Sequence, residues 1–152
     1  MDVRVREASV ADVSTILSIY KDAGVGRVAV SLDRATAIFD KMRRYPNYKV
    51  FVAEGAGQIV GTFALLIMDN LAGAPSGVVE DVAVQQSFQR KGIGKAMMKF
   101  AFEVCRVNGC YKMTLSSNTK RTEAHQFYES LGFVRHGYSF ALEPGAQAGL
   151  PA

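Results

Sequence analysis

The sequence predicts one domain of the α/β (α+β) class. Strand-like runs alternate along the chain with amphipathic helix patterns, and the run Val78 to Val84 leads through a glycine-containing turn into the strongest helix pattern, Ile93 to Val107. A length of 152 residues with 49% hydrophobic and 21% charged residues suits a single buried core. We expect a domain over residues 1–142 and a flexible C-terminal tail over residues 143–152, which are rich in Gly, Ala and Pro.

The first half of the chain predicts a strand, two helices and a hairpin. Ser9 is a suitable N-cap for the first helix, and Pro46 ends the second because the residue before a proline disfavours helical geometry. Gly55-Ala56-Gly57 lies between two β-rich runs, as in an antiparallel hairpin. The expected elements are a strand over 3–6, helices over 10–22 and 34–45, and strands over 48–53 and 59–68.

The second half predicts alternating strands and helices. A polar loop over residues 69–77 precedes the central strand, and Gly132 is placed to end the last helix. The expected elements are strands over 78–84, 111–115 and 133–142 and helices over 93–107 and 122–131.

The turn before the strongest helix, Gln89-Arg90-Lys91-Gly92-Ile93-Gly94-Lys95, predicts an anion cradle. Glycines let backbone N–H groups approach an anion, and a helix N-terminus adds partial positive charge. The spacing is not that of a P-loop, because Gln89 and Ala96 occupy its defining positions, nor that of a dinucleotide fingerprint, whose third glycine is replaced by Met97. The remaining interpretations are a diphosphate site and a tight turn without a ligand.

Charge and cysteine content narrow the function classes. The net charge of +4 comes from dispersed Lys and Arg residues, so we expect no nucleic-acid-binding arm. We see no signal-peptide core and no apolar run of membrane-spanning length, and we expect a cytoplasmic protein with no membrane partner. Cys105 and Cys110 lack metal-ligand spacing and are expected to be reduced, and His125 and His136 have no third ligand at a recognised spacing. We predict no metal site.

Three motifs occur in the order found in the GNAT N-acetyltransferases, which the chain resembles over residues 3–142. They are Glu80-Asp81-Val82-Ala83-Val84, the glycine turn, and Phe127-Tyr128-Glu129-Ser130-Leu131-Gly132-Phe133. The resemblance implies a GNAT fold: a mixed, twisted central sheet with splayed parallel middle strands, flanked by about four helices.

Two branches of that superfamily share features with the chain. Residues 79–84 and Gly109-Cys110-Tyr111-Lys112 resemble the glucosamine-6-phosphate N-acetyltransferases. The longer segment over residues 116–125 is more similar to the aminoalkylphosphonate N-acetyltransferases. The resemblance therefore implies a cofactor, acetyl-CoA as co-substrate, and leaves the acceptor amine open.

The resemblance also implies how the co-substrate is held. Backbone amides in the central strand would bond the pantetheine arm, and the turn amides would hold the pyrophosphate. Asn118 is either a further pantetheine contact or a cap for the following helix. The expected co-substrate residues are Val82, Ala83, Val84, Gln89, Arg90, Lys91, Gly92, Ile93, Gly94, Lys95 and Asn118.

Two catalytic residues are expected. Tyr128 matches the family tyrosine that protonates the departing thiolate, although an aromatic residue at helical spacing also suits core packing. Glu80 matches a position near the acceptor amine and would act as the base, directly or through water; its alternative role is to fix a loop or pair with an arginine. Asp81 faces the opposite side of a regular strand, unless a bulge exchanges the two.

We therefore expect an N-acetyltransferase that acts on a primary amine of a small metabolite, with the charge of that metabolite left open. The acetyl group would pass directly from acetyl-CoA to the amine within a ternary complex. The alternatives are a non-catalytic acyl-CoA sensor, a protein N-terminal or lysine acetyltransferase, and a nucleic-acid-binding protein. Dimerisation is common in the family, so a homodimer is among the expectations. Candidate anchors for an anionic acceptor are Arg27, Arg43, Arg44, Lys120 and Arg121.

Overall fold

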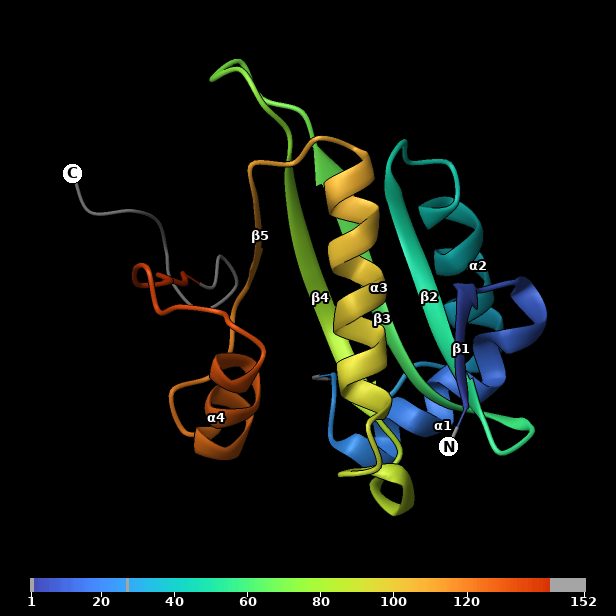
Figure 1. Ribbon diagram of the computed structural model, residues 1–152. Helices are drawn as coiled ribbons and strands as arrows, with labels where there is room; N and C mark the ends of the chain where they lie inside the picture. Colours follow the sequence, from blue (N-terminus) through green and yellow to red (C-terminus); the bar gives the residue numbers. More distant parts are fainter. Residues whose placement is uncertain (1, 27, 143–152) are drawn as a thin grey trace. The chain divides into compact units, whose positions relative to one another are not determined.

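The structure, a computed structural model, describes residues 2–26 and 28–142 (Figure 1). The chain forms two units, residues 1–115 and residues 116–152, and each is described by itself. The expected tail over residues 143–152 lies outside the described residues, as does Arg27.

A five-stranded sheet in the order β1-β2-β3-β4-β5 forms the centre of the first unit. β1 to β4 pair antiparallel, whereas β4 and β5 pair parallel, from Ser76 opposite Lys112 to Val79 opposite Leu115. The predicted mixed sheet is therefore confirmed. The strands are β1 (Val3–Glu7), β2 (Tyr48–Gly55), β3 (Gln58–Met68), β4 (Ser76–Val84) and β5 (Lys112–Leu115).

Helices cover both faces of this sheet. α3 (Ile93–Val107) lies across β3 and β4 in Figure 1, and the missing side chains of Gly61 and Gly77 leave room for Met97 and Cys105 of α3. α1 (Val13–Ala23) and α2 (Leu32–Met42) bury an apolar cluster against the other face, which includes Val50, Val52 and Ala64. Helix-on-sheet packing on both faces is what an α/β core requires.

Local sequence signals explain where these elements begin and turn. Ser9 N–H donates to Asp12 Oδ2 at 2.7 Å, which caps the short 3-10 helix (Val10–Asp12) that precedes α1. Ser31 Oγ accepts from Arg34 N–H at 3.3 Å and starts α2. The hairpin is confirmed, with Ala56 and Gly57 at φ of 51° and 78° in its tight turn.

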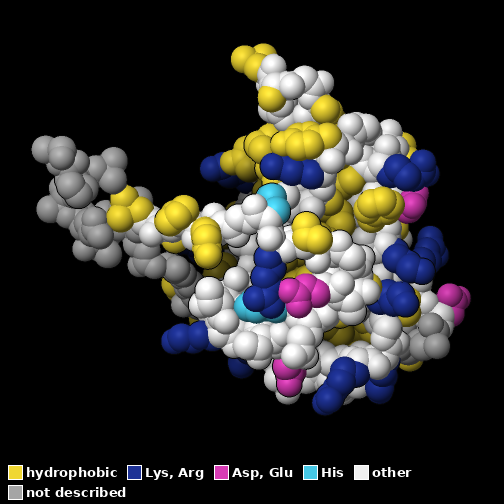
Figure 2. Space-filling view, turned by 60° about the vertical axis from the view of Figure 1, so that its left-hand side comes forward, with side chains coloured by type: hydrophobic (Ala, Val, Ile, Leu, Met, Phe, Trp, Pro, Cys, Tyr) yellow, Lys and Arg dark blue, Asp and Glu magenta, His cyan; other side chains and the backbone are white. Residues whose placement is uncertain are grey.

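The second unit contains α4 (Thr122–Ser130), which ends as predicted at Gly132, a residue with a φ of +93°. The predicted strand over residues 133–142 is wrong: these residues form no strand. Their alternating apolar pattern is real, but Tyr138 and Phe140 are each 93% exposed, and a strand needs a partner for its backbone groups. Figure 2 shows hydrophobic side chains standing out along the segment that runs into the grey residues.

No helix in residues 2–26 and 28–142 is both long enough and apolar enough to cross a membrane.

Candidate active site

A β-bulge in β4 reshapes the strand at the two acidic residues. Thr62 of β3 pairs with Ala83, but Ala64, two residues further on, pairs with Glu80, so β4 carries one extra residue there. At this bulge Asp81 has a φ of +52°, which lies in the left-handed region that aspartate tolerates better than most residues. The bulge removes the strict alternation between Glu80 and Asp81, and both are exposed.

Glu80 lies on the sheet face that packs against α1 and α2. It pairs with Ala64, which pairs with Val50, and both partners belong to the apolar cluster under those helices. Glu80 is exposed as a residue, but partial loss of solvent around its carboxyl raises the pKa of that group above its ordinary value, and the charge of Asp81 adds to this effect. A carboxylate with a raised pKa is a stronger base than an ordinary one.

Two tyrosines border these carboxylates, and the sequence did not mark them as site residues. Tyr20 of α1 and Tyr48 of β2 pack against the same apolar cluster. Burial raises the pKa of both phenols, with Asp81 contributing to each. Tyr20 was missed because it fits the apolar stripe of its helix, where Leu or Phe would pack equally well. Its hydroxyl group was the one feature of the sequence that could have indicated a role in the site.

One edge of β4 is left without a strand partner beside the bulge. β5 pairs with β4 only as far as Val79, so among the described residues of the first unit no strand pairs with the outer edge of residues 80–84. This edge includes Val82, Ala83 and Val84, the residues expected to bond pantetheine. An unpaired strand edge offers a row of backbone donors and acceptors to an extended ligand.

The turn between β4 and α3 presents a run of unused backbone donors. Arg90 and Gly92 have φ of 58° and 86°, which turns the chain sharply into the helix. Ala96 N–H donates to Gly92 O at 3.0 Å, but the N–H groups from Arg90 to Lys95 donate no hydrogen bond within the described residues. These donors lie at the positive end of a helix of 15 residues.

Gln89 braces this turn. Its N–H donates to Gln86 O at 3.2 Å, and its Nε2 donates to Val84 O at 3.2 Å. Gln86 in turn donates from its N–H to Asp22 Oδ2 at 2.6 Å, which ties the turn to the end of α1. The main-chain amide of Gln89 is thus occupied, and its contribution is to hold the shape of the turn.

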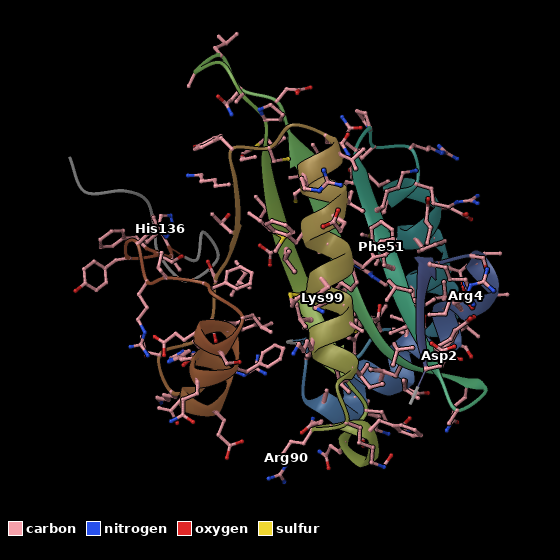
Figure 3. The ribbon with its side chains drawn as sticks, in the orientation of Figure 1. Asp2, Arg4, Phe51, Arg90, Lys99 and His136 are labelled. Atoms are coloured by element: carbon pink, nitrogen blue, oxygen red, sulfur yellow. The ribbon has the colours of Figure 1, made fainter. Side chains whose placement is uncertain are left out.

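The basic side chains of the turn lie at its surface. Figure 3 shows Arg90 pointing outward from the end of α3. Lys91 Nζ lies 5.0 Å from the centre of the Phe88 ring, a cation–π contact. Among the candidate acceptor anchors, Arg43 forms an ion pair at the end of α2, where its Nη2 lies 3.0 Å from Asp40 Oδ1.

In the second unit, the end of α4 fixes Tyr128. Phe133 N–H donates to Tyr128 O at 3.1 Å and Gly132 N–H donates to Glu129 O at 3.0 Å, the two bonds of a Schellman motif. The Phe133 ring meets Tyr128 edge-on with centroids 5.7 Å apart, and Phe127 lies 5.1 Å away. Burial raises the pKa of the Tyr128 phenol, and Arg121 partly opposes this.

Asn118 accepts hydrogen bonds from the residues just before α4. Its Oδ1 accepts from Lys120 N–H at 2.9 Å, and its main-chain oxygen accepts from Arg121 N–H at 3.0 Å. His125 Nε2 lies 2.9 Å from the same main-chain oxygen. These contacts shape the loop before α4, whose N-cap is Arg121 and has no side-chain capping bond, so neither alternative for Asn118 is decided. Within the described residues the Asn118 side-chain nitrogen donates no hydrogen bond.

The model of the acetyltransferase (GNAT) family matches residues 14–133. This chain belongs to the GNAT acetyltransferase family. The match includes the bulged strand, the turn and the Schellman motif around Tyr128, so the resemblance drawn from three motifs is confirmed. The GNAT fold is likewise confirmed by a solved acetyltransferase of Trypanosoma brucei, which is 30% identical, has a TM-score of 0.78, and is aligned over 93% of this chain and 99% of its own.

Three curated relatives have names that state a small-molecule substrate. A glucosamine 6-phosphate N-acetyltransferase of Trypanosoma brucei brucei is 38% identical over 97 residues, which cover 62% of this chain and 64% of the relative. An L-methionine sulfoximine/L-methionine sulfone acetyltransferase of Pseudomonas aeruginosa is 28% identical over 90% of this chain and 83% of its own. The aminoalkylphosphonate N-acetyltransferase of Salmonella typhimurium is 29% identical over 62% of each. The chain thus spans less than two thirds of the trypanosomal relative.

Among the described residues of this GNAT chain, no three His, Cys, Asp or Glu side chains are grouped so that they would hold a metal ion.

Proposed function

We propose that this chain is an acetyl-CoA-dependent N-acetyltransferase that acts on a primary amine of a small metabolite. The observation that carries the proposal is the run of unused N–H donors from Arg90 to Lys95 in a chain of the GNAT family. Backbone donors at a helix N-terminus suit a pyrophosphate, because they point at the anion and the helix dipole favours its charge. Arg90 and Lys91 add charge at the rim, and Gln89 braces the loop.

The open edge of β4 suits the rest of the carrier. Pantetheine is an extended chain with two amides, and the donors and acceptors of Val82, Ala83 and Val84 would pair with it as an added strand does. In this arrangement the thioester lies near the bulge, and an amide of the bulged strand is available to the carbonyl oxygen as negative charge develops on it.

Glu80 is proposed as the base. An amine must lose a proton before its nitrogen can attack, and the raised pKa of Glu80 suits it to accept that proton directly or through water. The free nitrogen then attacks the thioester carbonyl, and the carbon–sulfur bond breaks as the amide forms. Cys105 is buried in α3 and Cys110 lies beyond the end of that helix, so we infer a direct transfer without an acetylated enzyme.

Tyr128 is proposed as the acid. The departing thiolate needs a proton, and the phenol of Tyr128 retains its own because burial raises its pKa. Its ring is held by Phe133 and by the helix-ending bonds, so its position is determined by the backbone as well as by packing.

We infer a small acceptor because three of the curated relatives are named for small molecules: a sugar phosphate, an amino acid derivative and an aminoalkylphosphonate. The carboxylates and tyrosines beside β4 suit the amine end of such a molecule. Arg121 is a candidate for its anionic end, when it has one. Asn118 keeps its proposed contact with pantetheine through its side-chain nitrogen.

The test is release of free coenzyme A thiol from acetyl-CoA across a panel of amines, together with calorimetry of coenzyme A binding. We expect binding, and thiol release with one or more small amines. Binding without release by any small amine or peptide would favour the acyl-CoA sensor, and release only with peptides would favour a protein acetyltransferase. Absence of binding by folded protein would contradict the whole proposal.

A further inference from the structure

Two helix ends in this protein share one backbone geometry. At the end of α3, Cys110 N–H donates to Cys105 O at 3.0 Å and Gly109 N–H donates to Arg106 O at 3.1 Å. Gly109 has a φ of +71°. These are the bonds and the left-handed glycine of a Schellman motif, as at Gly132 after α4.

This geometry brings two particular side chains together. The residue after the glycine and the residue three positions before the helix cap commonly touch in a Schellman motif. After α4 the touching pair is Phe133 and Tyr128, whose ring centroids are 5.7 Å apart. After α3 the equivalent pair is Cys110 and Cys105, the residues joined by the longer backbone bond of the motif. The backbone thus holds two reduced thiols side by side.

The two thiols differ in their surroundings. Cys105 is 3% exposed and lies against β4, where a Cβ added at Gly77 would overlap its Sγ. Burial, and then the neighbouring Cys110, raise the pKa of the Cys105 thiol to about 12. Cys110 is partly exposed, so a reagent reaches the pair through Cys110.

We propose that Cys105 and Cys110 are a redox modification site, a dithiol that a hydroperoxide converts into an intramolecular disulfide. The Cys110 thiolate attacks the peroxide, the O–O bond breaks, and Cys110 becomes a sulfenic acid as an alcohol or water leaves. The Cys105 thiol then loses its proton as its sulfur attacks the Cys110 sulfur, the S–O bond breaks, and the departing hydroxide takes up a proton and leaves as water. The two thiols lose two electrons and two protons, and the peroxide is reduced.

The disulfide would join the end of α3 to the chain that enters β5. Closing this short loop is expected to raise the unfolding temperature by about 5 °C. The pair lies at the opposite end of α3 from the candidate cradle, and a helix of 15 residues is about 22 Å long. Coenzyme A binding is therefore expected to change less than twofold, which makes the site independent of the proposed acetyl transfer.

The test treats the full chain with hydrogen peroxide and maps the thiols by mass spectrometry with and without a reductant. We expect a peptide joined through Cys105 and Cys110, and its loss in Cys110→Ser. Gly109→Ala keeps both thiols but strains the motif, and is expected to slow the joining at least about fivefold. Gly132→Ala introduces the same change after α4 and is the matched control, with an unchanged rate of joining.

Three results would overturn the proposal. One is oxidation of Cys110 to the sulfinic acid while Cys105 stays a free thiol. Another is a disulfide that forms only between chains. The third is an equal rate of joining in Gly109→Ala and the unsubstituted protein, which would mean that the helix end does not hold the thiols together.

Discussion

At the scale of single residues, the bulge at Asp81 determines the environment of Glu80. The sequence predicts opposite faces for these two carboxylates in a regular strand, with a bulge as the exception. The exception is what the structure contains, because β3 pairs across an extra residue of β4. The raised pKa of Glu80 follows from that local geometry together with burial.

The pKa of Glu80 is open to a direct test. We expect its carboxyl to titrate above the ordinary value of 4.5, and we expect Asp81→Asn to lower that pKa because a neighbouring negative charge is removed. Carbon-13 NMR titration of the Glu80 side chain measures both. An unchanged pKa in Asp81→Asn would mean that burial alone accounts for the shift.

Tyr128→Phe removes the proposed acid and keeps the ring. Acetyl transfer is expected to fall about a hundredfold in kcat, while coenzyme A binding stays the same. Tyr138→Phe is the matched control, since Tyr138 is 93% exposed and outside the proposed site, and its activity should match the unsubstituted protein. Equal kcat in both variants would exclude Tyr128 as the acid.

The hydrogen bonds between Arg6 and Asp12 should make the stability of the fold depend on pH. Asp12 accepts from Arg6 Nη1 at 2.7 Å and from Nη2 at 3.0 Å, and these bonds hold the pKa of its carboxyl at about 2 instead of 3.8. Because the folded-state pKa is the lower one, the stabilisation is present above pH 3.8 and is lost as the pH falls toward 2.

Asp12→Asn should therefore lower the free energy of unfolding at neutral pH by about 2 kcal/mol and should reduce the loss of stability in acid. Urea unfolding at several pH values measures this. Asp40→Asn is the control, since Asp40 pairs with Arg43 at an exposed position and its removal should change stability by less than about 1 kcal/mol. An acid profile unchanged in Asp12→Asn would contradict the assignment.

At the scale of elements, the contact of α3 with the sheet depends on small residues. A Cβ added at Gly61 would lie 2.7 Å from Met97 Sδ and 3.1 Å from Ile93 Cγ2. Gly61→Ala is expected to destabilise the fold by about 1–3 kcal/mol through overpacking. Gly137→Ala, which meets nothing within 4 Å, is the control and should be nearly neutral in the same thermal or urea unfolding measurement.

Most elements follow from their local sequence. The bounds of α3 agree with its predicted range, and α4 and β5 agree within a residue, because glycines and helical periodicity act over short distances. The first helix was less regular than expected, beginning as a 3-10 turn at Val10. Residues 133–142 have the period of a strand but no partner, and periodicity alone cannot supply one.

At the scale of the whole molecule, binding of acetyl-CoA should leave a defined footprint in hydrogen exchange. The amides from Arg90 to Lys95 donate to no group among the described residues, so a bound pyrophosphate should slow their exchange. The edge at residues 80–84 should be protected as well, while β1 should be unchanged. Mass spectrometry of the full chain with and without acetyl-CoA measures this, and protection confined to other regions would contradict the proposed cradle.

We expect the net positive charge of the molecule to play only a limited role in ligand binding. On the face that Figure 2 shows, Lys and Arg side chains lie in separate groups and not in one block. Charge of this kind favours the approach of a phosphorylated ligand, but the specific contacts proposed here come from backbone groups. Family membership adds support because the matched region, residues 14–133, contains the turn and Tyr128 together.

The sequence by itself determined the glycine turn, the helix that follows it, the glycine-ended helix that holds Tyr128, and the family. Each depends on bonds between residues close along the chain, which residue type and spacing specify. The tertiary structure decided the bulge at Asp81, the position of Tyr20 and Tyr48 near that carboxylate, and the lack of a strand over residues 133–142. These depend on which segments pair and pack across the sheet, and contacts between distant residues leave no periodic signal in either segment alone.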